Sequence, residues 1–511
     1  MIGAQSSHAQ IYKWVDENGH MQFSDKAPPK SASDTNEVVS NKLIKKQKTI
    51  LPSSSMITLK VRGLLEDNKF KALNTYLAKL QANADLNILK ERELYTAYYA
   101  FRIEDKSYEQ LFNAWVKSTP NNYSAYLARA RYYYGLGWMV RGNNWASETK
   151  KEKMQEMTMY FNKAMIDIAS SYKINDKSQV LYTTLINISN TVGRGKEASA
   201  AAQRALEIHP TSFVVRASYL NSLTPRWGGT YEKMALFIKQ SLTYAKENPE
   251  LNWLKGAIHA DLASMSSIQK ARNTAEKGFS QALALGEYHA YFYERGRVRY
   301  KLEKYAEALG DFNQAIDAYP ENKDYYYWRA RTYSKLQNNV KATLDAEIAF
   351  KLAPYEKRIS GMYERLLVLE GYKLRNTKKK ALEIEKYTMA LGVNPNNADT
   401  HSRRARAYLM QGKNKLALKD LDKAINLDPN KVEYYVLIDF VLAKTSSWKK
   451  IITYWDKFIA LNPESGQAYR NRGGAFYRMG DMKSAIKDAK KSANLGDLAG
   501  KQIYEKFRVQ E

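Results

Sequence analysis

The sequence predicts an all-α fold: an α-solenoid of about twelve helical hairpins, preceded by a small β-hairpin module and a flexible linker. Three observations lead to this prediction. The 511 residues include only 25 Gly and 12 Pro, about 7% together where roughly 12% is usual, so helix breakers are few. Prolines in the C-terminal part recur at a spacing of 34 residues. The chain is also too long for one compact core, whereas stacked repeats can bury a core of any length.

The net charge and the missing cysteines narrow the classes of function. Lys and Arg total 80 against 53 for Asp and Glu, a formal net charge of +27 at pH 7, and there is no Cys. The lack of Cys excludes disulfide frameworks, cysteine-based zinc sites, iron–sulfur clusters and thiol nucleophiles. No stretch reaches the roughly 18 apolar residues of a membrane-spanning helix, so the sequence predicts no transmembrane segment.

Residues 1–9 are interpreted as the remnant of a signal peptide. Ser7, His8 and Ala9 have the small-x-small form of a signal-peptidase site, but the basic and apolar stretches that precede such a site are missing. We therefore expect Met1 to be an internal methionine of a longer, exported precursor. The alternative is a short cytoplasmic terminus.

A β-hairpin is predicted for residues 10–29. Asn18-Gly19 favours a type I′ turn because both residues tolerate positive φ, and strand-forming residues flank it. The segment resembles an uncharacterised module of Gram-negative envelope proteins; the matching residues are Tyr12, Trp14, Asp16, Gly19, Phe23, Ser24 and Asp25. Members of that module usually follow a signal peptide. The resemblance therefore implies a periplasmic or envelope-associated protein of a Gram-negative bacterium, with the cytoplasm as the alternative.

Residues 30–55 predict a basic flexible linker. The segment is rich in Ser, Thr, Asn and Lys, lacks hydrophobic periodicity, and contains a basic run of Lys42, Lys45, Lys46 and Lys48. Such a composition does not bury enough apolar surface to order the backbone.

Residues 56–288 predict irregular helical repeats. Residues 135–145 lengthen one repeat, and Pro225 to Gly229 replace a tight turn between helices. Trp138, Arg141 and Gly142, followed by Arg226 to Gly229, resemble a bacterial helical-repeat family of unknown function over roughly residues 60–290. The resemblance supplies no catalytic residues. We expect Trp138, Trp145 and Trp227 to hold irregular loops, and a ligand pocket shared by these loops is the alternative.

Residues 289–497 predict a regular array. Prolines at 320, 354, 395, 429 and 463 are 34, 41, 34 and 34 residues apart, and small residues such as Gly296, Ala308 and Ala315 precede the first of them. These offsets resemble the tetratricopeptide repeat (TPR), a pair of antiparallel helices that small residues allow to approach closely. The irregular residues 56–288 are then TPR-like hairpins too. Residues 498–511 are expected to form a capping helix with a polar outer face.

Four repeats share an arginine at position 7 and an aspartate at position 23. Three other copies that align without gaps have neither, so the two residues occur together, although recent duplication of the C-terminal copies would produce the same pattern. We predict structural ion pairs between the two helices of a repeat. The pairs are Arg295–Asp311, Arg329–Asp345, Arg404–Asp420 and Arg472–Asp488.

The TPR resemblance implies that the first helix of each repeat lines a concave groove. Interleaved Tyr and Arg at those positions suit recognition of a protein or peptide, and an acidic partner would suit the arginines. The predicted groove residues are Tyr293, Arg297, Tyr300, Tyr327, Arg331, Lys335, Arg403, Arg406, Arg470 and Tyr477, and Trp328 also falls at such a position. The alternative is a solvated face with ordinary aromatic packing.

A search for catalytic chemistry finds no candidate. The six His include no pair at the i, i+4 spacing of a helical metal site, and no phosphate-binding loop or nucleophile motif is present. The sequence therefore predicts a non-enzymatic scaffold without catalytic residues, metal or cofactor. A binder of anionic envelope polymers or lipid headgroups is the alternative, and no nucleic-acid-binding module is recognisable. The oligomeric state is left open.

Overall fold

The computed structural model describes residues 12–15, 21–24, 56–142 and 148–509. The chain divides into two units, residues 1–56 and 57–511. In the first unit, strands β1 (Tyr12–Val15) and β2 (Met21–Ser24) pair antiparallel, with Tyr12 opposite Ser24. The predicted turn at Asn18-Gly19, residues 1–9 and the linker at 30–55 lie outside the described residues, as does Trp145.

The described part of residues 57–511 is helical, as the sequence predicts. The helices that precede the regular array are α2 (Ile57–Glu66), α3 (Phe70–Leu86), α4 (Glu91–Tyr99), α5 (Glu109–Ser118), α6 (Tyr123–Arg141), α7 (Lys151–Ile174), α8 (Gln179–Thr191), α9 (Gly195–Ile208), α10 (Phe213–Ser222), α11 (Tyr231–Ser241), α12 (Ala257–Ile268) and α13 (Arg272–Leu285). Short 3-10 segments lie among them: η1 (Ile88–Lys90), η2 (Lys106–Tyr108), η4 (Pro225–Trp227), η5 (Leu242–Tyr244) and η6 (Pro249–Gly256).

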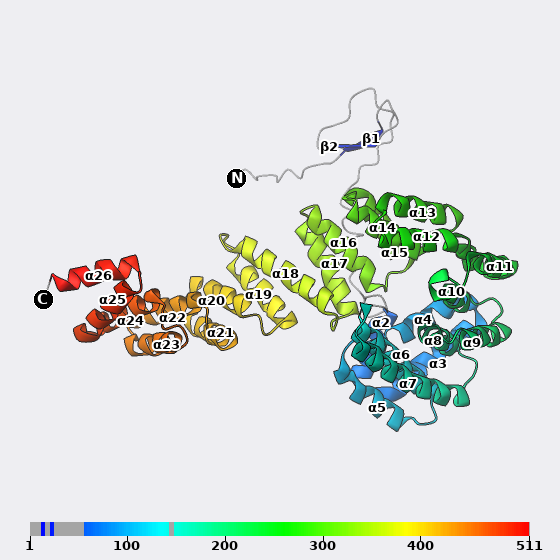
Figure 1. Ribbon diagram of the computed structural model, residues 1–511, viewed down its shortest axis with the longest axis horizontal. Helices are drawn as coiled ribbons and strands as arrows, with labels where there is room; N and C mark the ends of the chain where they lie inside the picture. Colours follow the sequence, from blue (N-terminus) through cyan, green and yellow to red (C-terminus); the bar gives the residue numbers. More distant parts are fainter. Residues whose placement is uncertain (1–11, 16–20, 25–55, 143–147, 510–511) are drawn as a thin grey trace, which may run out of the picture. The chain divides into compact units, whose positions relative to one another are not determined.

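The regular array follows with one helix pair per repeat. Its helices are α14 (His289–Lys301), α15 (Tyr305–Ala318), α16 (Lys323–Lys335), α17 (Asn339–Leu352), α18 (Lys357–Leu374), α19 (Lys380–Val393), α20 (Ala398–Met410), α21 (Asn414–Leu427), α22 (Val432–Ala443), α23 (Trp448–Leu461), α24 (Gly466–Met479) and α25 (Met482–Asn494). A last helix, α26 (Leu498–Arg508), packs on α25 where a capping helix was expected. Figure 1 shows these elements in order.

Small buried residues explain the close packing within each repeat. Ala308, Ala342, Ala417 and Ala485 are completely buried at equivalent positions of the second helices. Gly296 in α14 has the ring of Phe312 in α15 about 2.8 Å from where a Cβ would lie, so no larger residue fits without a shift. The periodic small residues of the sequence are therefore the points where the two helices of a repeat meet.

One segment differs from the sequence-based expectation. Residues 135–141, interpreted as an irregular extension, belong to the helix α6 instead. Gly137 lies directly against the ring of Phe161 in α7, where a side chain would clash. Gly137 thus serves a close approach of two long helices, whereas Gly135 lies against the backbone of Arg102. Trp138 is itself helical, and residues 143–147, which follow α6, lie outside the described residues.

The helices that precede the array close onto its first repeats. Glu321, in the loop between α15 and α16, accepts hydrogen bonds from the backbone N–H groups of Ile57 and Thr58 (2.9 and 2.7 Å). Arg62 of α2 donates to the carbonyls of Lys351 and Leu352 at the end of α17 (3.1 and 2.6 Å). A carboxylate at a helix N-terminus and a guanidinium at a C-terminus both satisfy unpaired backbone groups.

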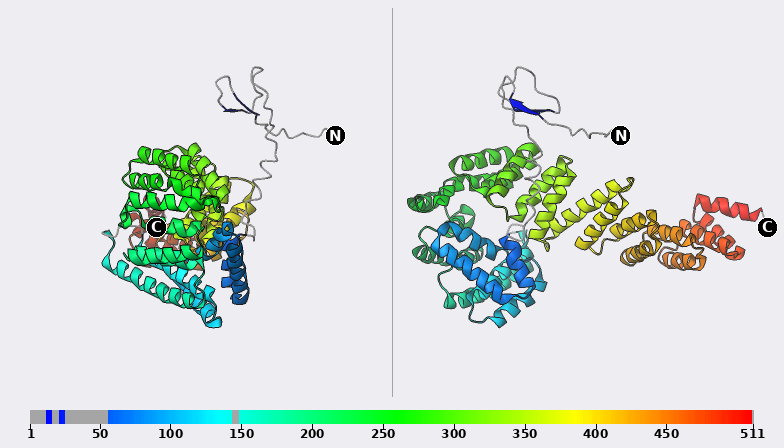
Figure 2. Two further views of the ribbon diagram at one scale, coloured as in Figure 1. Left: turned by 90° about the vertical axis from the view of Figure 1, so that its right-hand side faces the viewer. Right: turned by 180° about the vertical axis from the view of Figure 1, so that it is seen from behind.

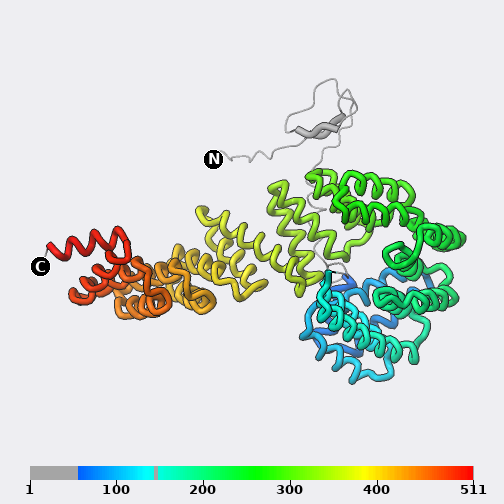
Figure 3. The backbone as a smooth tube through the Cα atoms, viewed as in Figure 1, coloured from blue at the N-terminus to red at the C-terminus, as the bar shows by residue number. Residues whose placement is uncertain are grey.

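The views of the backbone agree with these contacts. Figure 3 shows the chain returning so that α2 lies beside α17, while Figure 2 shows α18 to α26 continuing away from the earlier helices. Within the described residues, no helix has the length and apolar character needed to cross a lipid bilayer.

Candidate functional site

A tryptophan contacted by two arginines is the centre of the candidate site. The ring centroid of Trp328 in α16 lies 4.5 Å from the guanidinium carbon of Arg331 and 5.3 Å from that of Arg297 in α14. Guanidinium groups stack favourably on indole because the face of the ring is electron-rich. Arg297 also bonds Glu294 at 2.9 Å. Within the described part of the chain, Arg331 makes no ion pair within 4.0 Å.

Two tyrosines complete this arrangement, named here the Trp328 cluster (Arg297, Tyr300, Tyr327, Trp328 and Arg331). Tyr300 and Tyr327 meet the Trp328 ring edge-on, at centroid distances of 5.3 and 6.0 Å. Tyr293 adjoins the cluster, since Arg297 lies 5.4 Å from its ring. The structure thus brings together five of the predicted groove residues in two neighbouring repeats: Tyr293, Arg297, Tyr300, Tyr327 and Arg331.

A cavity of about 850 Å³, the central cavity, adjoins the cluster. Arg297 and Trp328 of the array line it, as do Arg62, Arg102 and Trp138 of the earlier region. The cavity exists because α2 packs on α17, Thr96 of α4 bonds Tyr319, and the Tyr355 hydroxyl donates to the carbonyl of Arg102. No repeat pattern predicts these contacts. Its further polar lining residues are Glu104, Glu321, Lys323, Asp324, Glu356, Lys357 and Arg358.

The acids of the central cavity are mostly neutralised. Lys323 bonds Glu356, and Arg358 bonds Asp324 and Glu356. Burial alone would raise the pKa of Asp324, but Lys323 and Arg358 outweigh it and hold that pKa below its usual range. Arg102 is different, because its guanidinium lies over Tyr99 and Tyr134 at 5.3 and 5.1 Å. The cavity therefore combines paired charges with a cation held by aromatic faces.

Arg403 and Arg406 lie apart from the Trp328 cluster, in a second cavity of about 340 Å³ that Arg375 also lines. This three-arginine cavity (Arg375, Arg403 and Arg406) is bounded by Tyr372, Tyr387 and Tyr434. Arg375 follows the last residue of α18, in the irregular copy where repeat counting has no fixed position for it.

The remaining predicted groove residues are dispersed. Lys335 is exposed at the end of α16. Arg470 bonds Asp497 at 3.1 Å, and Tyr477 packs on Phe507 of α26 at 5.6 Å. Both line a cavity of about 260 Å³ beneath α26. The ten predicted residues thus do not form one continuous site.

The structure brings together each of the four predicted Arg–Asp pairs. In each, the guanidinium donates through two nitrogens to both carboxylate oxygens, with closest distances of 2.7 to 2.8 Å, and the aspartate is buried. The pairs join the two helices of a repeat. These arginines are therefore engaged within the fold.

A fifth pair of the same kind was missed by sequence reasoning. Arg129 of α6 donates to both oxygens of Asp167 in α7, at 2.9 and 2.7 Å. It also bonds Asn113, 16 residues earlier, as Arg329 bonds Asn313. Arg129 stands at position 7 of its repeat, but the long α6–α7 pair places the aspartate 38 residues away instead of 16. A search with variable spacing would have found it.

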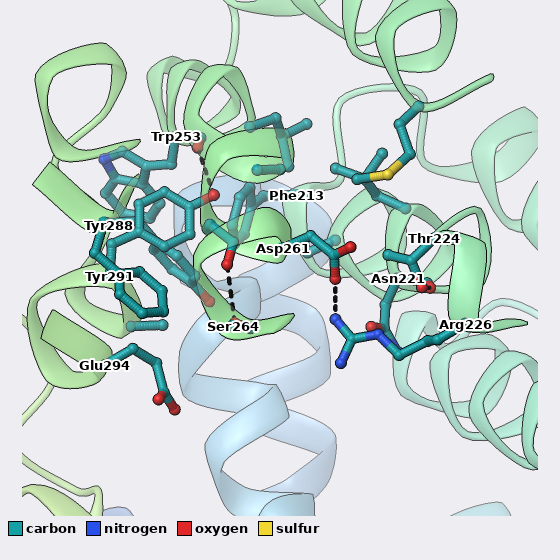
Figure 4. A pocket seen from close by; sticks show the side chains of 18 residues that line it. Phe213, Asn221, Thr224, Arg226, Trp253, Asp261, Ser264, Tyr288, Tyr291 and Glu294 are labelled. Carbon is teal, nitrogen blue, oxygen red and sulfur yellow. Dashed lines mark hydrogen bonds and ion pairs between the residues drawn. The ribbon is translucent and has the colours of Figure 1, made fainter. Parts of the chain in front are cut away.

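The region around Arg226 holds a smaller cavity, of about 230 Å³. Figure 4 shows Arg226 paired with Asp261 at one side and the aromatic residues Phe213, Trp253 and Tyr288 at the other. Trp138 lines the central cavity instead, and Trp227 is partly exposed beside Arg226. Among the described residues, Trp138 and Arg226 thus line different cavities, while Trp145 lies outside the described residues.

The described residues hold no cluster of three or more His, Asp or Glu side chains suited to a metal ion. The most strongly shifted histidine is His289, which bonds Tyr325 at 2.6 Å. Burial lowers its pKa to about 3, with Arg92 adding to the effect. It packs against Tyr319 inside the fold, so its environment is that of a core residue.

Sequence-family models match four parts of the chain. Two models described as tetratricopeptide repeat match residues 293–355 and 398–431. A domain of unknown function, DUF4124, matches residues 1–42, and a second, DUF4034, matches residues 58–196 and 202–261. The two repeat matches contain the Trp328 cluster and two arginines of the three-arginine cavity.

Curated relatives share the repeats at low identity. A DnaJ homolog subfamily C member 7 homolog of Dictyostelium discoideum is 24% identical over 302 residues, which are 55% of this chain and 55% of the relative. The Hsp70-Hsp90 organizing protein of Triticum aestivum is 24% identical over 221 residues, 42% of this chain and 37% of the relative. This chain thus spans about half, or less, of the length of the relatives it matches.

Among solved structures, YrrB, "a TPR protein with an unusual peptide-binding site", is similar at 22% identity with a TM-score of 0.28, over 38% of this chain and 94% of that one. The TPR2AB domain of yeast Sti1 in complex with pHSP90 is similar at 16% identity with a TM-score of 0.23, over 44% of this chain and 97% of that one.

Proposed function

We propose that this chain, a tetratricopeptide repeat protein with an N-terminal domain of unknown function, is a non-enzymatic scaffold that binds a segment of a partner protein. The Trp328 cluster is the observation that supports this best. It presents indole, phenol and guanidinium groups on two adjacent repeats beside a cavity of about 850 Å³. Trp, Tyr and Arg are the residues that dominate binding energy at protein interfaces.

The charges of the cluster favour a partner with acidic side chains. Arg331 lies 4.5 to 5.8 Å from three aromatic rings and makes no ion pair within 4.0 Å among the described residues, so its guanidinium keeps hydrogen-bonding capacity for a carboxylate. The names of the curated relatives, which include an Hsp70-Hsp90 organizing protein, are consistent with a role in assembling other proteins. The partner is defined here by its chemistry, an acidic segment with an apolar or aromatic anchor.

Site-specific crosslinking in cells tests this function. A photo-crosslinking amino acid at exposed Lys335, on the same helix as Trp328 and Arg331, should give discrete protein adducts. The double variant Arg297→Gln and Arg331→Gln should lose them. Lys341→Gln, an exposed change in α17, is the matched control and should keep them. Adducts that persist in the double variant would refute this binding site.

We further propose that the protein works in the envelope of a Gram-negative bacterium, with residues 10–29 as a β-hairpin module. The resemblance of this segment to an envelope module supports the location, whereas the antiparallel pairing of β1 and β2 bears on the hairpin alone. Fractionation of cells that express the gene from its native locus tests it. Recovery of the protein in the cytoplasmic fraction alone would contradict it.

Binding of anionic envelope polymers is the second candidate, which the three-arginine cavity and the net charge of +27 favour. The two candidates differ in their response to salt. The affinity for a polyanion should fall steeply and log-linearly with salt concentration, because bound counterions are released. Crosslinking at an aromatic-anchored groove should weaken only modestly over the same range.

A further inference from the structure

The three-arginine cavity gathers three arginines that have no ion-pair partner among the described residues. Arg403 and Arg406 project from α20, and Arg375 from the end of α18, into a space of about 340 Å³. Across the part of the chain that the structure describes, none of the three makes an ion pair within 4.0 Å. Arg403 lies 5.7 Å from the ring of Tyr372, which is a weaker contact than an ion pair.

Two of the three acids that line the same cavity are already bonded to other groups. Asp399 accepts from Lys431 at 2.7 Å and from Tyr434 at 2.8 Å. Glu383 is bonded by Lys380 at 3.0 Å and is buried. Glu433, the remaining acid of the lining, is exposed. Cations still outnumber acids in the lining by four (Arg375, Arg403, Arg406 and Lys431) to three, and although Asp399 partly offsets Arg403, none of the three guanidinium groups has a paired carboxylate in the described part of the chain.

Arg404 on the same helix has an ion-pair partner, in contrast to Arg403 and Arg406. Arg404, between Arg403 and Arg406 in sequence, turns to the other side of α20 and bonds both oxygens of Asp420 at 2.8 Å. Arg406 receives no such partner. Burial lowers its pKa, and the charges of Arg375 and Arg403 lower it further. Placing three like charges around one cavity is unfavourable unless an anion occupies it.

We propose that the three-arginine cavity binds an oxyanion, a phosphate or a carboxylate group. Guanidinium groups match both geometries through paired N–H donors, and the tyrosine walls at 372, 387 and 434 can hold the carbon skeleton that bears the group. The biological role of this site rests on the proposed function, because the oxyanion would belong to the partner that binds this repeat. Anion binding itself is measured on the isolated protein.

Calorimetric titration of the full chain with sodium phosphate, and separately with sodium glutarate, tests the proposal at constant ionic strength set by sodium chloride. We expect saturable binding of one of the two, and the preferred salt identifies a phosphate or a carboxylate source. Arg406→Gln and, separately, exposed Arg403→Gln should weaken it about tenfold or more, because each removes a charged hydrogen-bond donor. Arg365→Gln, an exposed arginine of α18 outside the cavity, should bind as the wild type does.

Thermal unfolding provides a second readout that a structural role would not produce. Without added anion, Arg406→Gln should unfold at the wild-type temperature or above it, because repulsion is relieved. The anion should raise the unfolding temperature of the wild type and not that of the variant. The proposal is overturned if neither phosphate nor glutarate shows saturable binding above the sodium chloride background, or if Arg406→Gln binds the anion as tightly as the wild type does. Absence of crosslinks from Lys335 in the otherwise wild-type chain, with intact anion binding, would instead count against the proposed scaffold function alone.

Discussion

The regular array and the helices before it use the same ion pair in different settings. In α14 to α25 the arginine and the aspartate are 16 residues apart in four repeats, whereas Arg129 and Asp167 in α6 and α7 are 38 apart. The bidentate geometry is the same in both regions. The comparison shows that the contact between paired helices is retained while the length of chain between them varies.

The two regions differ more in how far their contacts reach along the chain. In the array, each repeat packs mainly on its sequence neighbours. In the earlier region, Glu91 of α4 bonds the backbone N–H of Phe213 in α10 at 2.7 Å, and Glu321 bonds α2 across more than 260 residues. A destabilising substitution in the array should therefore loosen only its own and adjacent repeats, as in other linear repeats. A substitution that breaks a long-range contact, such as that of Glu91 or Glu321, should destabilise several of the earlier helices.

The largest expected effect is the loss of an aspartate from one of the repeated pairs. Asp420 is 4% exposed and accepts from Arg404, and also from His401 at 3.1 Å. Asp420→Ala leaves these donors unpaired, which costs about 3–5 kcal/mol for a buried pair. Urea unfolding should show the loss. Hydrogen exchange should place it in α20 and α21 and leave α2 to α13 unchanged.

The matched control for this change is Asp456→Ala. Its side chain is 52% exposed and bonds Arg472 at 2.7 Å, so its removal should cost less than about 1 kcal/mol. Asp167→Ala breaks the equivalent pair of the earlier region, and there the increase in exchange should extend beyond α6 and α7. An unchanged unfolding curve for Asp420→Ala would show that these pairs do not stabilise the array.

Low pH should destabilise the contact between the two regions, where α14 of the array is linked to α4 through Tyr319. His289 begins α14 and stacks on Tyr319, whose hydroxyl bonds Thr96 of α4 at 2.8 Å. Its pKa is lowered by burial to about 3, so the folded protein holds it neutral, while the unfolded chain takes up a proton below its ordinary value of 6.5. Stability from this group is complete above pH 6.5 and falls as pH decreases, by about 2 kcal/mol at pH 5.

The measurement for this prediction is urea unfolding at pH 7 and pH 5. The wild type should lose more stability between the two than His289→Phe, which keeps an aromatic ring against Tyr319 and cannot be protonated. Hydrogen exchange in α4 and α14 should follow the same difference. Equal losses in both proteins would show that His289 does not contribute to the acid sensitivity of this contact.

A smaller effect is expected from Glu321→Gln. Glutamine keeps one acceptor oxygen but loses the negative charge at the N-terminus of α2, so the closure should weaken by about 1 kcal/mol. Exchange of the amides of Ile57–Glu66 should speed up, whereas Glu464→Gln, an exposed acid between α23 and α24, should change nothing there. Equal exchange in both variants would mean that Glu321 does not hold α2 in place.

The sequence was informative where the contacts are local. The proline spacing and the arginine and aspartate at positions 7 and 23 lie within one repeat, so a fixed offset identifies them. Residues 135–141 were misinterpreted because Gly137 serves a helix–helix contact with Phe161 and Gly135 a contact with the backbone of Arg102, which local sequence does not distinguish from a loop.

The candidate site was partly predictable for the same reason. Arg297, Tyr300, Tyr327 and Arg331 fall at groove positions of adjacent repeats, and adjacent repeats meet in space. Arg102 reaches the central cavity only through the closure of α2 and α4 onto the array, a contact between segments over 200 residues apart. Arg375 joins the three-arginine cavity from an irregular copy of 41 residues, to which the fixed offset does not apply.

The smallest expected effect on stability is that of Arg331→Gln, and its small size is informative. Arg331 contacts three aromatic rings at 4.5 to 5.8 Å, which contributes about 0.5–1 kcal/mol at a partly exposed site. Arg329, two residues earlier, bonds Asp345 at 2.7 Å and belongs to the structural set. Arg329→Gln should therefore destabilise α16 and α17 far more than Arg331→Gln, while the Arg331 change should reduce crosslinking from Lys335 at nearly full stability. If the two variants lose stability equally, Arg331 is a structural residue, and the distinction between paired arginines and partner-binding arginines fails for this repeat.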